Sequence, residues 1–542
     1  MIEEQTYTIV FHPSGIRTKA WPGELVGTVA LRAGVQIGQP CGGAGVCGKC
    51  RVRVPDGGAF LGEPSATERR LLSEKDLNEG MRLACCAMVW GDGMVQVVDG
   101  VETRDQQILE SIAAGASLDW DAPRPGLGVA IDIGTTTVAC CLLDLQEQTV
   151  LDLLSFLNPQ IPFGDDVLSR ISYSVMTPGG LEQLHKVLLG GINRACGTLA
   201  ERNGARPEDI RELVVAANTV MEHTFMNVSP ESIGQGPDYR PVFLEHDPVP
   251  AAFLGLELHS EALVRLIPNV AGYVGGDIVA GVVATGMERE APLRLLVDIG
   301  TNNEIVLGNR EDLLCCAAAA GPALEGACIQ YGMRAGRGAI ERVRQKRLEA
   351  DGLEVDVIGE VEPKGICGSG LVDAVALLLR EGLLDRSGRL APPESGSSGL
   401  RARLGRTERG MVQFLLTDER SPVWLTQKDV REVQLALGAI RVGIDVMLEH
   451  RGVTLEQVDE ILLAGAFGSY IDLGCAMEVG LLPRVAPSKV RGVRNSSGLG
   501  ACMGVASRGF LERTKETARK MRYVELSLLP DFQRRFVKAM IF

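Results

Sequence analysis

Three cysteines lie within ten residues near the start of the chain: Cys41, Cys47 and Cys50. Glycines stand between them in the stretch PCGGAGVCGKC, and further cysteines follow in RLACCAMV. An iron–sulfur cluster needs four soft thiolate ligands. Glycines let backbone N–H groups turn toward the cluster sulfurs, because no Cβ atom blocks the approach. The pattern therefore predicts an iron–sulfur site, with Cys85 or the adjacent Cys86 as the fourth ligand.

A zinc ribbon or a set of buried structural cysteines could also place cysteines at this spacing. A zinc ribbon normally pairs two Cys-x-x-Cys knuckles, and this region has one. Buried structural cysteines are the simpler alternative, which the spacing disfavours. The surrounding sequence is typical of a hairpin in YTIVFHPSGIRTKAWPG, a helix in GELVGTVALRAGV and a strand in RVRV. We therefore expect a small domain built around the cysteines.

Two stretches further along share one arrangement of polar residues after an apolar strand: GVAIDIGTTTVACCLLDL and LRLLVDIGTNNEIVLGN. Backbone N–H groups at such a turn can cradle phosphate, and the carboxylates can hold Mg²⁺ through water. One copy is a weak signal, but two copies indicate two related lobes that clasp one nucleotide. The candidate residues are Asp132, Gly134, Thr135, Thr136 and Thr137 in the first stretch, and Asp298, Gly300, Thr301 and Asn302 in the second.

Three more segments fit a nucleotide-binding protein. GYVGGDIVAGVVATGM and NSSGLGACMG carry small residues at helical spacing, which permits close helix crossing at a hinge. The apolar strand of LLAGAFGSY leads into a place for a base or ribose. Asp277 begins the first of these helices and Glu304 directly follows the second phosphate stretch, so either could orient an attacking water. The residues at the end of the apolar strand are Gly465, Ala466, Phe467 and Gly468.

Length and composition set the frame for these motifs. The chain has 542 residues, 65 of them glycine, with few aromatics, which favours several α/β domains. A net charge of −14 argues against nucleic acid or an anionic membrane as the main partner. The N-terminus lacks an apolar signal region, no stretch is long and apolar enough to span a membrane, and the 14 cysteines indicate a reducing cytoplasm.

A cluster of Pro, Gly and Asp in DWDAPRPG marks a domain boundary. We expect a cluster-binding domain over 1–99, a linker over 100–126 that acts as a tether, and a two-lobed domain over 127–542. An electron carrier that collects its electron in one place and delivers it in another benefits from such reach.

The first domain resembles a β-grasp ferredoxin with a [2Fe–2S] cluster, and the five-residue gap between its first two cysteines resembles the adrenodoxin-like branch. The match to RLAC assigns Cys85 as the fourth ligand. The later motifs, in their order, resemble the acetate and sugar kinase, heat-shock chaperone and actin superfamily. That resemblance implies a two-lobed actin-like ATPase, a duplicated ribonuclease H-like fold.

Several longer segments resemble one family, the reductive activators of corrinoid enzymes: NPQIPFGDDVLSRI, GPALEGACIQYGMRAGRGAI, GICGSGLVDAV, REVQLALGAIRVGI and YVELSLLPDFQRRFVKAMIF. The resemblance implies an ATPase that reduces inactive cobalt(II) to cobalt(I) with an electron from the [2Fe–2S] cluster, in methyl-transfer metabolism. It implies ATP and Mg²⁺ as further cofactors. The expected partners are a corrinoid protein or methyltransferase component and an upstream low-potential electron donor, and the resemblance also allows a homodimer.

Three residues depart from the family pattern. Asn303 and Ala217 stand where glycine is usual, and Leu437 stands where we would expect lysine. We expect Asn303 to tolerate a positive φ in the turn. The polar His223 and the pairs Cys140–Cys141 and Cys315–Cys316 are interpreted as structural.

Two more classes of function are compatible with the sequence. One is a metabolite kinase with a redox-regulatory ferredoxin domain, although no acceptor motif is evident. The other is a non-catalytic redox-sensing protein, which the acidic residues of both phosphate stretches argue against.

Overall fold

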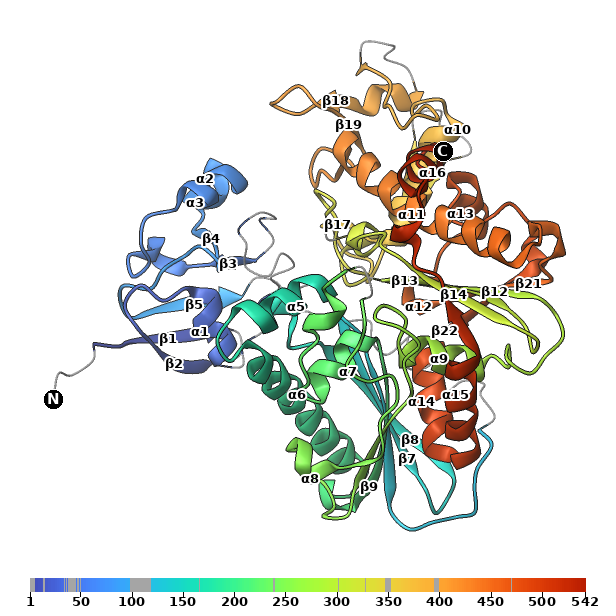
Figure 1. Ribbon diagram of the computed structural model, residues 1–542. Coiled ribbons are helices and arrows are strands. Elements are labelled where there is room, and N and C mark those ends of the chain that lie inside the picture. The colour runs from blue at the N-terminus through green and yellow to red at the C-terminus, as the bar shows by residue number, and fades with distance from the viewer. Residues whose placement is uncertain are drawn as a thin grey trace. The chain divides into compact units, whose positions relative to one another are not determined.

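The computed structural model describes residues 5–12, 15–33, 35, 37, 45, 48, 50–97, 118–164, 166–236, 239–300, 302–326, 328–346, 352–393, 399–468 and 470–542. The chain forms two compact units (Figure 1). The first unit consists of Met1–Glu102 and Leu157–Leu188, and the second consists of Thr103–Phe156 and Leu189–Phe542.

The first unit contains a five-stranded sheet in the order β2-β1-β5-β3-β4. β1 and β5 are parallel, and the other neighbouring strands are antiparallel. Val26, Val29 and Ala30 of helix α1 pack in one core with Phe11 and Val95 of the sheet. This is the expected β-grasp arrangement. Its elements are β1 (Tyr7–His12), β2 (Ile16–Ala20), α1 (Val26–Arg32), β3 (Arg51–Arg53), α2 (Ala66–Leu71), α3 (Glu74–Asn78), β4 (Met81–Leu83) and β5 (Gly93–Val97).

The rest of the chain is built on two six-stranded sheets in which five neighbouring strands correspond, β11-β9-β6-β7-β8 in the first and β22-β21-β12-β13-β14 in the second. The first runs β10-β11-β9-β6-β7-β8 and the second β22-β21-β12-β13-β14-β23. In each sheet an antiparallel hairpin, β6–β7 or β12–β13, stands next to two strands that are parallel to its first strand. This repeat is the duplicated ribonuclease H-like pattern of an actin-like ATPase, as the sequence predicts.

The strands of the first sheet are β6 (Leu127–Ile133), β7 (Thr137–Asp144), β8 (Thr149–Leu157), β9 (Ile210–Ala217), β10 (Val249–Pro250) and β11 (Leu263–Leu266). Those of the second are β12 (Arg294–Ile299), β13 (Asn303–Gly308), β14 (Leu313–Ala318), β21 (Glu460–Ala464), β22 (Val490–Arg494) and β23 (Met521–Tyr523). Two small sheets consist of β15 (Ala339–Gln345), β16 (Leu353–Val357) and β17 (Gly365–Ile366), and of β18 (Leu404–Arg406), β19 (Val412–Leu415) and β20 (Trp424–Thr426). The remaining described helices are α5 (Val167–Met176), α6 (Gly180–Arg202), α7 (Thr219–Phe225), α8 (Ala251–Leu254), α9 (Gly276–Ala284), α10 (Gly368–Arg380), α11 (Gln427–Arg451), α12 (Gly465–Gly468), α13 (Leu473–Val479), α14 (Ser496–Ala506), α15 (Arg508–Lys520) and α16 (Phe532–Ala539).

Helices α9 and α14 share one hydrophobic core with residues of both large sheets (Figure 1). Their approach is very close, because a Cβ atom on Gly500 would lie 2.7 Å from both the Cβ and the carbonyl oxygen of Ala280. A Cβ atom on Gly281 would lie 2.6 Å from Ser496 Oγ. Two small-residue helices therefore meet almost backbone to backbone, which confirms the close crossing that their sequences predict.

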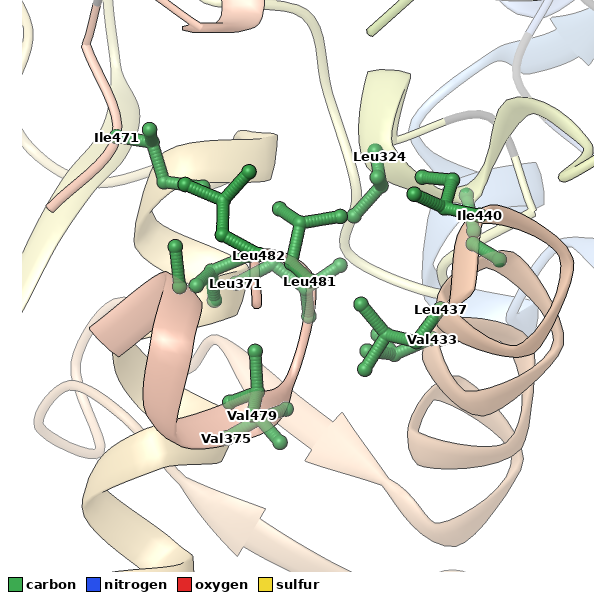
Figure 2. Close-up of a cluster of buried hydrophobic side chains, with 14 of the residues drawn as sticks. Leu324, Leu371, Val375, Val433, Leu437, Ile440, Ile471, Val479, Leu481 and Leu482 are labelled. Carbon is green, nitrogen blue, oxygen red and sulfur yellow. The ribbon is translucent and has the colours of Figure 1, made fainter. Parts of the chain in front are cut away.

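A second core fills the other face of the β12–β14 sheet, where α10, α11 and α13 pack (Figure 2). Leu437 lies in α11 with no exposed surface and packs in this core with Leu324 and Ile440. A lysine at this position would bury its ammonium group, so leucine here is a core residue.

The cysteine pairs outside the first unit are core residues, as expected. Cys140 and Cys141 lie in β7, and Cys315 and Cys316 lie in β14, all of them buried. Burial raises the pKa of the thiols of Cys140, Cys315 and Cys316, so they stay protonated at neutral pH. In the described part of the chain, no helix has both the length and the apolar character to cross a membrane.

We predict that Gly500→Ala lowers the melting temperature of the second unit, because the added methyl group must push α14 away from Ala280. Overpacking of this kind costs about 1–3 kcal/mol. Gly197→Ala in α6 is the matched control, since a Cβ atom there meets nothing within 4 Å. That change should leave stability unchanged or raise it by up to about 1 kcal/mol. Equal melting temperatures for the two variants, measured by calorimetry, would contradict the close crossing.

Candidate functional site

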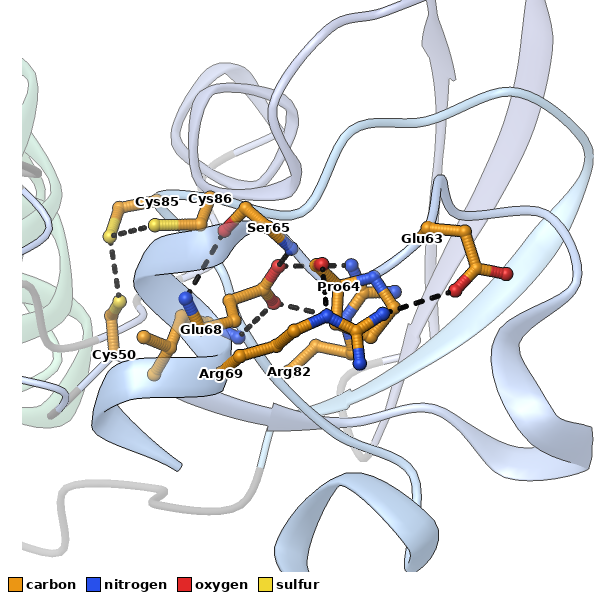
Figure 3. A network of polar contacts seen from close by, with 10 residues as sticks. Cys50, Glu63, Pro64, Ser65, Glu68, Arg69, Arg82, Cys85 and Cys86 are labelled. Atoms are coloured by element: carbon orange, nitrogen blue, oxygen red, sulfur yellow. Dashed lines mark hydrogen bonds and ion pairs between the residues drawn. The ribbon is translucent and has the colours of Figure 1, made fainter. Parts of the chain in front are cut away.

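Two cysteine sulfurs meet at one end of the β3–β4 pair in the first unit (Figure 3). Cys50 precedes β3 and Cys85 follows β4, and the backbone N–H of Ala84 donates to the carbonyl of Cys50 at 2.8 Å. The antiparallel pairing thus brings the Sγ atoms of Cys50 and Cys85 to 3.2 Å from one another. Cys41 and Cys47, the other two predicted ligands, lie outside the described residues.

The described part of the cysteine loop has a backbone that suits a cluster. Gly45 and Gly48 both have φ of +68°, which a glycine adopts without strain. The guanidinium of Arg51 donates to the Gly48 carbonyl at 3.2 Å, and that of Arg70 to the Gly45 carbonyl at 3.5 Å. A thiol pair beside a glycine loop whose carbonyls are bound by arginines fits a [2Fe–2S] cluster.

The neighbouring Cys86 has a different environment. Its Sγ lies 3.6 Å from that of Cys85, whereas Cys85 is the residue that faces Cys50. Burial, together with the adjacent Cys85, raises the pKa of the Cys86 thiol to about 12. These facts support Cys85 as the ligand.

Glu68 holds the end of β4 that leads to Cys85, a role that no motif in the sequence indicates. This buried carboxylate accepts from Arg82 Nε at 2.9 Å and from the N–H of Leu83 at 3.0 Å, and it caps α2 with Ser65 (Figure 3). Burial alone would raise the pKa of Glu68, but the hydrogen bonds from Arg82, Ser65 and Leu83 lower it. The ion pair therefore ties α2 to β4, two residues before the ligand.

In the second unit, the β6–β7 hairpin presents the first set of predicted phosphate residues. The turn closes with the N–H of Gly134 donating to the Thr137 carbonyl at 2.9 Å, and a Cβ atom on Gly134 would lie 2.7 Å from that oxygen. Thr135 accepts from Asn218 Nδ2 at 3.1 Å, and Thr136 donates to Glu325 at 3.2 Å. The hairpin is thus braced from two distant segments.

Asp132, at the end of β6, is held by the start of α14. Its Oδ2 accepts from Asn495 Nδ2 at 2.9 Å and its Oδ1 from Ser497 Oγ at 2.8 Å. Asn495 is also the N-cap of α14. An Asn before a small-residue helix marks the helix start in the sequence, but it does not indicate the contact with Asp132.

The β12–β13 hairpin presents the second set. Asp298 and Glu304 stand opposite each other in the register, so both side chains lie on one face of the sheet. A Cβ atom on Gly465 would lie 2.8 Å from Asp298 Oδ1, and Gly465 has φ of +86°, so the strand β21 ends against this carboxylate. Gly300 and Asn302 lie in the turn between the strands.

Asn303 is the first residue of β13, and the described non-glycine residues with positive φ do not include it. The turn is formed without a positive φ at Asn303, so the expected tolerance of asparagine for that conformation is not needed here. Extended backbone accommodates any residue, which explains why asparagine replaces glycine here. Of the remaining predicted residues, Thr301 and the side chains of Ala466 and Phe467 lie outside the described part of the structure.

Asp277 stands in the first turn of α9, whose start is held by Asn269 and Glu222, neither of which belongs to a motif in the sequence. Asn269 accepts from the N–H of Gly276 at 3.2 Å and donates to Glu222 at 2.6 Å. Glu222 is fully buried, and burial followed by the charge of Asp277 raises its pKa, which keeps it neutral. This pair sets the position of Asp277.

Four carboxyl groups lie near one another at this place: Asp132, Asp277, Asp298 and Glu304. Burial, then repulsion from Asp132 and Asp298, raises the pKa of Asp277 to about 8. Burial and Asp132 raise the pKa of Asp298 to about 7. The pKa of Glu304 rises for the same reasons, with Asp277 and Asp298 as the neighbouring charges. The group therefore cannot ionise fully at neutral pH without a cation.

Among the described residues, no three His, Cys, Asp or Glu side chains are placed to ligate one metal ion directly. Neighbouring carboxyl groups that do not converge on a single point suit a hydrated cation such as Mg²⁺, which keeps several of its waters. Two hairpin turns with backbone N–H groups, four carboxyl groups and a helix N-terminus can bind a polyphosphate with its cation and can activate water.

His223 takes no part in this site. Val242 donates its N–H to His223 Nε2 at 3.0 Å, Nδ1 lies 2.7 Å from the Thr219 carbonyl, and the ring stacks on Phe243 at 4.3 Å. Burial lowers the pKa of His223 to about 4. It is a neutral structural histidine, as interpreted from the sequence.

Known families match most of the chain. Residues 9–89 match a profile described as the 2Fe-2S iron-sulfur cluster binding domain. Residues 127–290 match the RACo middle region, and residues 292–542 match the C-terminal domain of RACo, the ASKHA domain.

Three relatives are similar over long stretches. The chain is 29% identical to the corrinoid activation enzyme RamQ of Eubacterium limosum, with 96% of each chain covered. It is 25% identical to the [Co(II) methylated amine-specific corrinoid protein] reductase of Methanosarcina barkeri, with 67% of each covered. A solved structure of the reductive activator for corrinoid, iron-sulfur protein matches with 33% identity and a TM-score of 0.70, over 99% of this chain and 98% of that one.

The cysteine geometry predicts that Cys85→Ser loses the cluster, whereas Cys86→Ser keeps it. Cys85 faces Cys50 across 3.2 Å, and Cys86 is a thiol of high pKa. Iron content and the spin-half signal of the reduced protein measure the outcome. The parent protein should carry about two irons per chain, as a [2Fe–2S] cluster requires. If Cys86→Ser loses the cluster and Cys85→Ser keeps it, Cys86 is the fourth ligand instead.

The carboxyl groups of the second unit predict a pH-dependent cost of folding. Because the folded-state pKa of Asp298 is about 7 against an ordinary 3.8, the stability that its proton contributes is present below about pH 4 and is lost as pH rises to about 7. Asp298→Asn should therefore melt higher than the nucleotide-free parent, by a margin that grows between about pH 4 and about pH 7 and reaches on the order of 4 kcal/mol.

The control is Asp247→Asn, an exposed aspartate of the same unit. It should leave the melting temperature unchanged at both pH values. A margin for Asp298→Asn that stays constant or shrinks with rising pH would show that the carboxyl groups do not repel one another.

Proposed function

The chain belongs to the RACo family of reductive activators of corrinoid proteins, and from this membership we propose that it restores a corrinoid protein by reducing inactive cobalt(II) to cobalt(I) at the expense of ATP. The observation that carries the proposal is the presence of two kinds of site in one chain. A thiol pair at Cys50 and Cys85 suits an electron carrier, and paired hairpins with buried carboxyl groups suit an ATPase.

We assign 1–99 to the ferredoxin domain, 100–126 to the linker and 127–542 to the ATPase domain. The described end of that linker, 118–126, belongs to the second compact unit. The proposed cluster ligands are Cys41, Cys47, Cys50 and Cys85. The bound [2Fe–2S] cluster would supply a one-electron carrier of low potential.

Different residues of the second unit bind different parts of ATP. The N–H groups of the two hairpin turns hold the phosphates, and Asp132 and Asp298 hold a Mg²⁺ through its waters. Such an ion offsets phosphate charge at the transferred group. The strand end at Gly465–Gly468 takes the adenosine.

Asp277 and Glu304 are the proposed candidates for orienting the attacking water. Asp277 carries a proton at neutral pH in the empty site, because its pKa is about 8. It becomes a carboxylate, and hence a proton acceptor, only when positive charge offsets its burial and the repulsion from Asp132 and Asp298. Asp277 can therefore act as a base only when the cation and nucleotide are bound.

ATP is needed because the electron transfer is uphill. Cobalt(I) of a corrinoid forms only at very low potential, whereas even a plant-type [2Fe–2S] ferredoxin has a potential of only roughly −400 mV. Each further ~59 mV costs a factor of ten in a one-electron equilibrium. ATP supplies the drive only if it distinguishes two states of the protein, and two lobes joined through α9 and α14 provide such states.

The expected partners follow from the chemistry. They are a corrinoid protein or methyltransferase component as acceptor and a low-potential protein as electron donor. The protein would work in the reducing cytoplasm, where its thiols stay reduced.

The proposal predicts that cobalt(I) accumulates only when ATP is hydrolysed. The full chain, a cobalt(II) corrinoid protein and a low-potential reductant should give the cobalt(I) absorbance with ATP and not with a non-hydrolysable analogue. Asp298→Ala should abolish both ATP turnover and cobalt(I) formation, while its cluster spectrum stays intact. Cobalt(I) formed equally well without ATP would overturn the coupling.

A further inference from the structure

The segment Leu118–Gly126, here called the anchor segment, is the described end of the connection between the two predicted domains. It packs on the corner where α14 ends and α15 begins. Leu118 and Trp120 are partly buried against the core that contains α9 and α14. The connection is therefore fixed at this end.

Asp121 makes the main polar contacts of the anchor segment. Its N–H donates to the carbonyl of Ala506, the last residue of α14, at 3.0 Å. Its carboxylate accepts from Ser507 Oγ at 3.1 Å and from the N–H of Arg508 at 2.7 Å. Gln148 Nε2 donates to its carbonyl at 2.6 Å. Asp121 thus holds the helix corner through its N–H and its carboxylate, while its carbonyl binds Gln148.

The contact to Arg508 caps a helix in an unusual way. Arg508 is the first residue of α15, and the N-cap residue Ser507 makes no side-chain capping bond of its own. The carboxylate of Asp121 supplies the missing acceptor from another segment, and a negative charge at a helix N-terminus is favourable. The anchor segment is consequently part of the α14–α15 corner.

Arg124 adds a second attachment. Its guanidinium donates to the carbonyl of Val505 in α14 and to Glu212 at 3.2 Å. Glu212 is buried and also pairs with Arg265 at 3.1 Å and with Arg508 at 2.5 Å. The network connects the anchor segment with β9, β11 and α15.

The opposite end of α14 lies at the nucleotide site. Asn495 and Ser497 hold the two carboxylate oxygens of Asp132. The helix has 11 residues, about 16 Å. Its middle is packed against Ala280 without room to bend, so a shift at Asp132 moves its far end as well.

From this arrangement we infer that Asp121 is a positioning residue for the electron-transfer step: it passes the nucleotide-dependent movement of α14 to the chain segment that leads to the ferredoxin domain. The inference rests on the proposed function. It assigns to helix α14 the coupling between ATP hydrolysis and electron delivery, because α14 binds Asp132 at one end and Asp121 at the other. Asp121 touches no part of the nucleotide site, so its role is separate from ATP hydrolysis.

Trp120 allows a direct test, because it adjoins Asp121 and the chain has only three other tryptophans, Trp21, Trp90 and Trp424. In a full-length protein with those three replaced by phenylalanine, MgADP and a non-hydrolysable MgATP analogue should give different Trp120 emission. Adding Asp121→Ala should remove the difference. Asp119→Ala, at an exposed neighbouring position, should keep it.

The activity arm uses the same variants with all tryptophans present. Asp121→Ala should keep partner-stimulated ATPase at the parental rate but yield about fivefold less cobalt(I) per ATP, the lower end of usual coupling between sites. Asp119→Ala should match the parent. Ser507→Ala removes one of the two carboxylate contacts and serves as a milder variant if Asp121→Ala folds poorly, with an intermediate loss expected in both readouts.

The outcomes separate this inference from the proposed function. If the parent makes no cobalt(I) at all, the proposed function fails, but the emission arm still tests the helix link. If the parent shows no nucleotide-dependent emission, or if Asp121→Ala and Ser507→Ala keep both the emission difference and the full cobalt(I) yield, the positioning role is refuted.

Discussion

Repulsion among buried carboxyl groups is the constraint on which the second unit depends. Asp132, Asp277, Asp298 and Glu304 come from three separate parts of the fold, and burial raises the pKa of each, with charge repulsion adding to the rise for the last three. No folding benefit explains such a cluster, because a buried like-charge group costs stability. It makes sense as a place whose negative charge is balanced only when a cation arrives with the nucleotide, so occupancy can control the protein.

The architecture serves this constraint. Two sheets that share the arrangement of five neighbouring strands each bring one hairpin to the cluster, and α9 and the start of α14 bring Asp277 and the partners of Asp132 to it. At the crossing of these two helices, glycine and alanine leave no layer of side chains between the backbones. Asp132 is bound at one end of α14 and the anchor segment at the other, which is the arrangement that the inferred coupling requires.

The sequence predicted the parts that depend on local patterns. Both hairpins follow from an apolar strand that ends in Asp and Gly, and the β-grasp unit was implied by the resemblance of the first domain to ferredoxins. Contacts between distant segments were not predictable, since Asn495 and Ser497 reach Asp132 across more than 360 residues. The sequence pattern drew attention to His223, and it did not indicate that the neighbouring Glu222 helps to position Asp277. The Pro and Gly of DWDAPRPG indicated a linker throughout, whereas Trp120 and Asp121 within it are bound to the ATPase core. Leu437 and Asn303 were unexpected only because their burial and strand geometry cannot be read from one sequence.

The central claim is that the cation bound with the nucleotide relieves the repulsion among the four buried carboxyl groups. It predicts that binding releases protons. Isothermal titration of the protein with an ADP already saturated with Mg²⁺, in two buffers of different ionisation enthalpy, measures the protons exchanged on binding. Since Asp277 and Asp298 have pKa values of about 8 and about 7 in the empty site, binding at about pH 7 should release a substantial fraction of a proton, and the release should fade by about pH 9 or above. Proton uptake, or no exchange at about pH 7, would contradict the account.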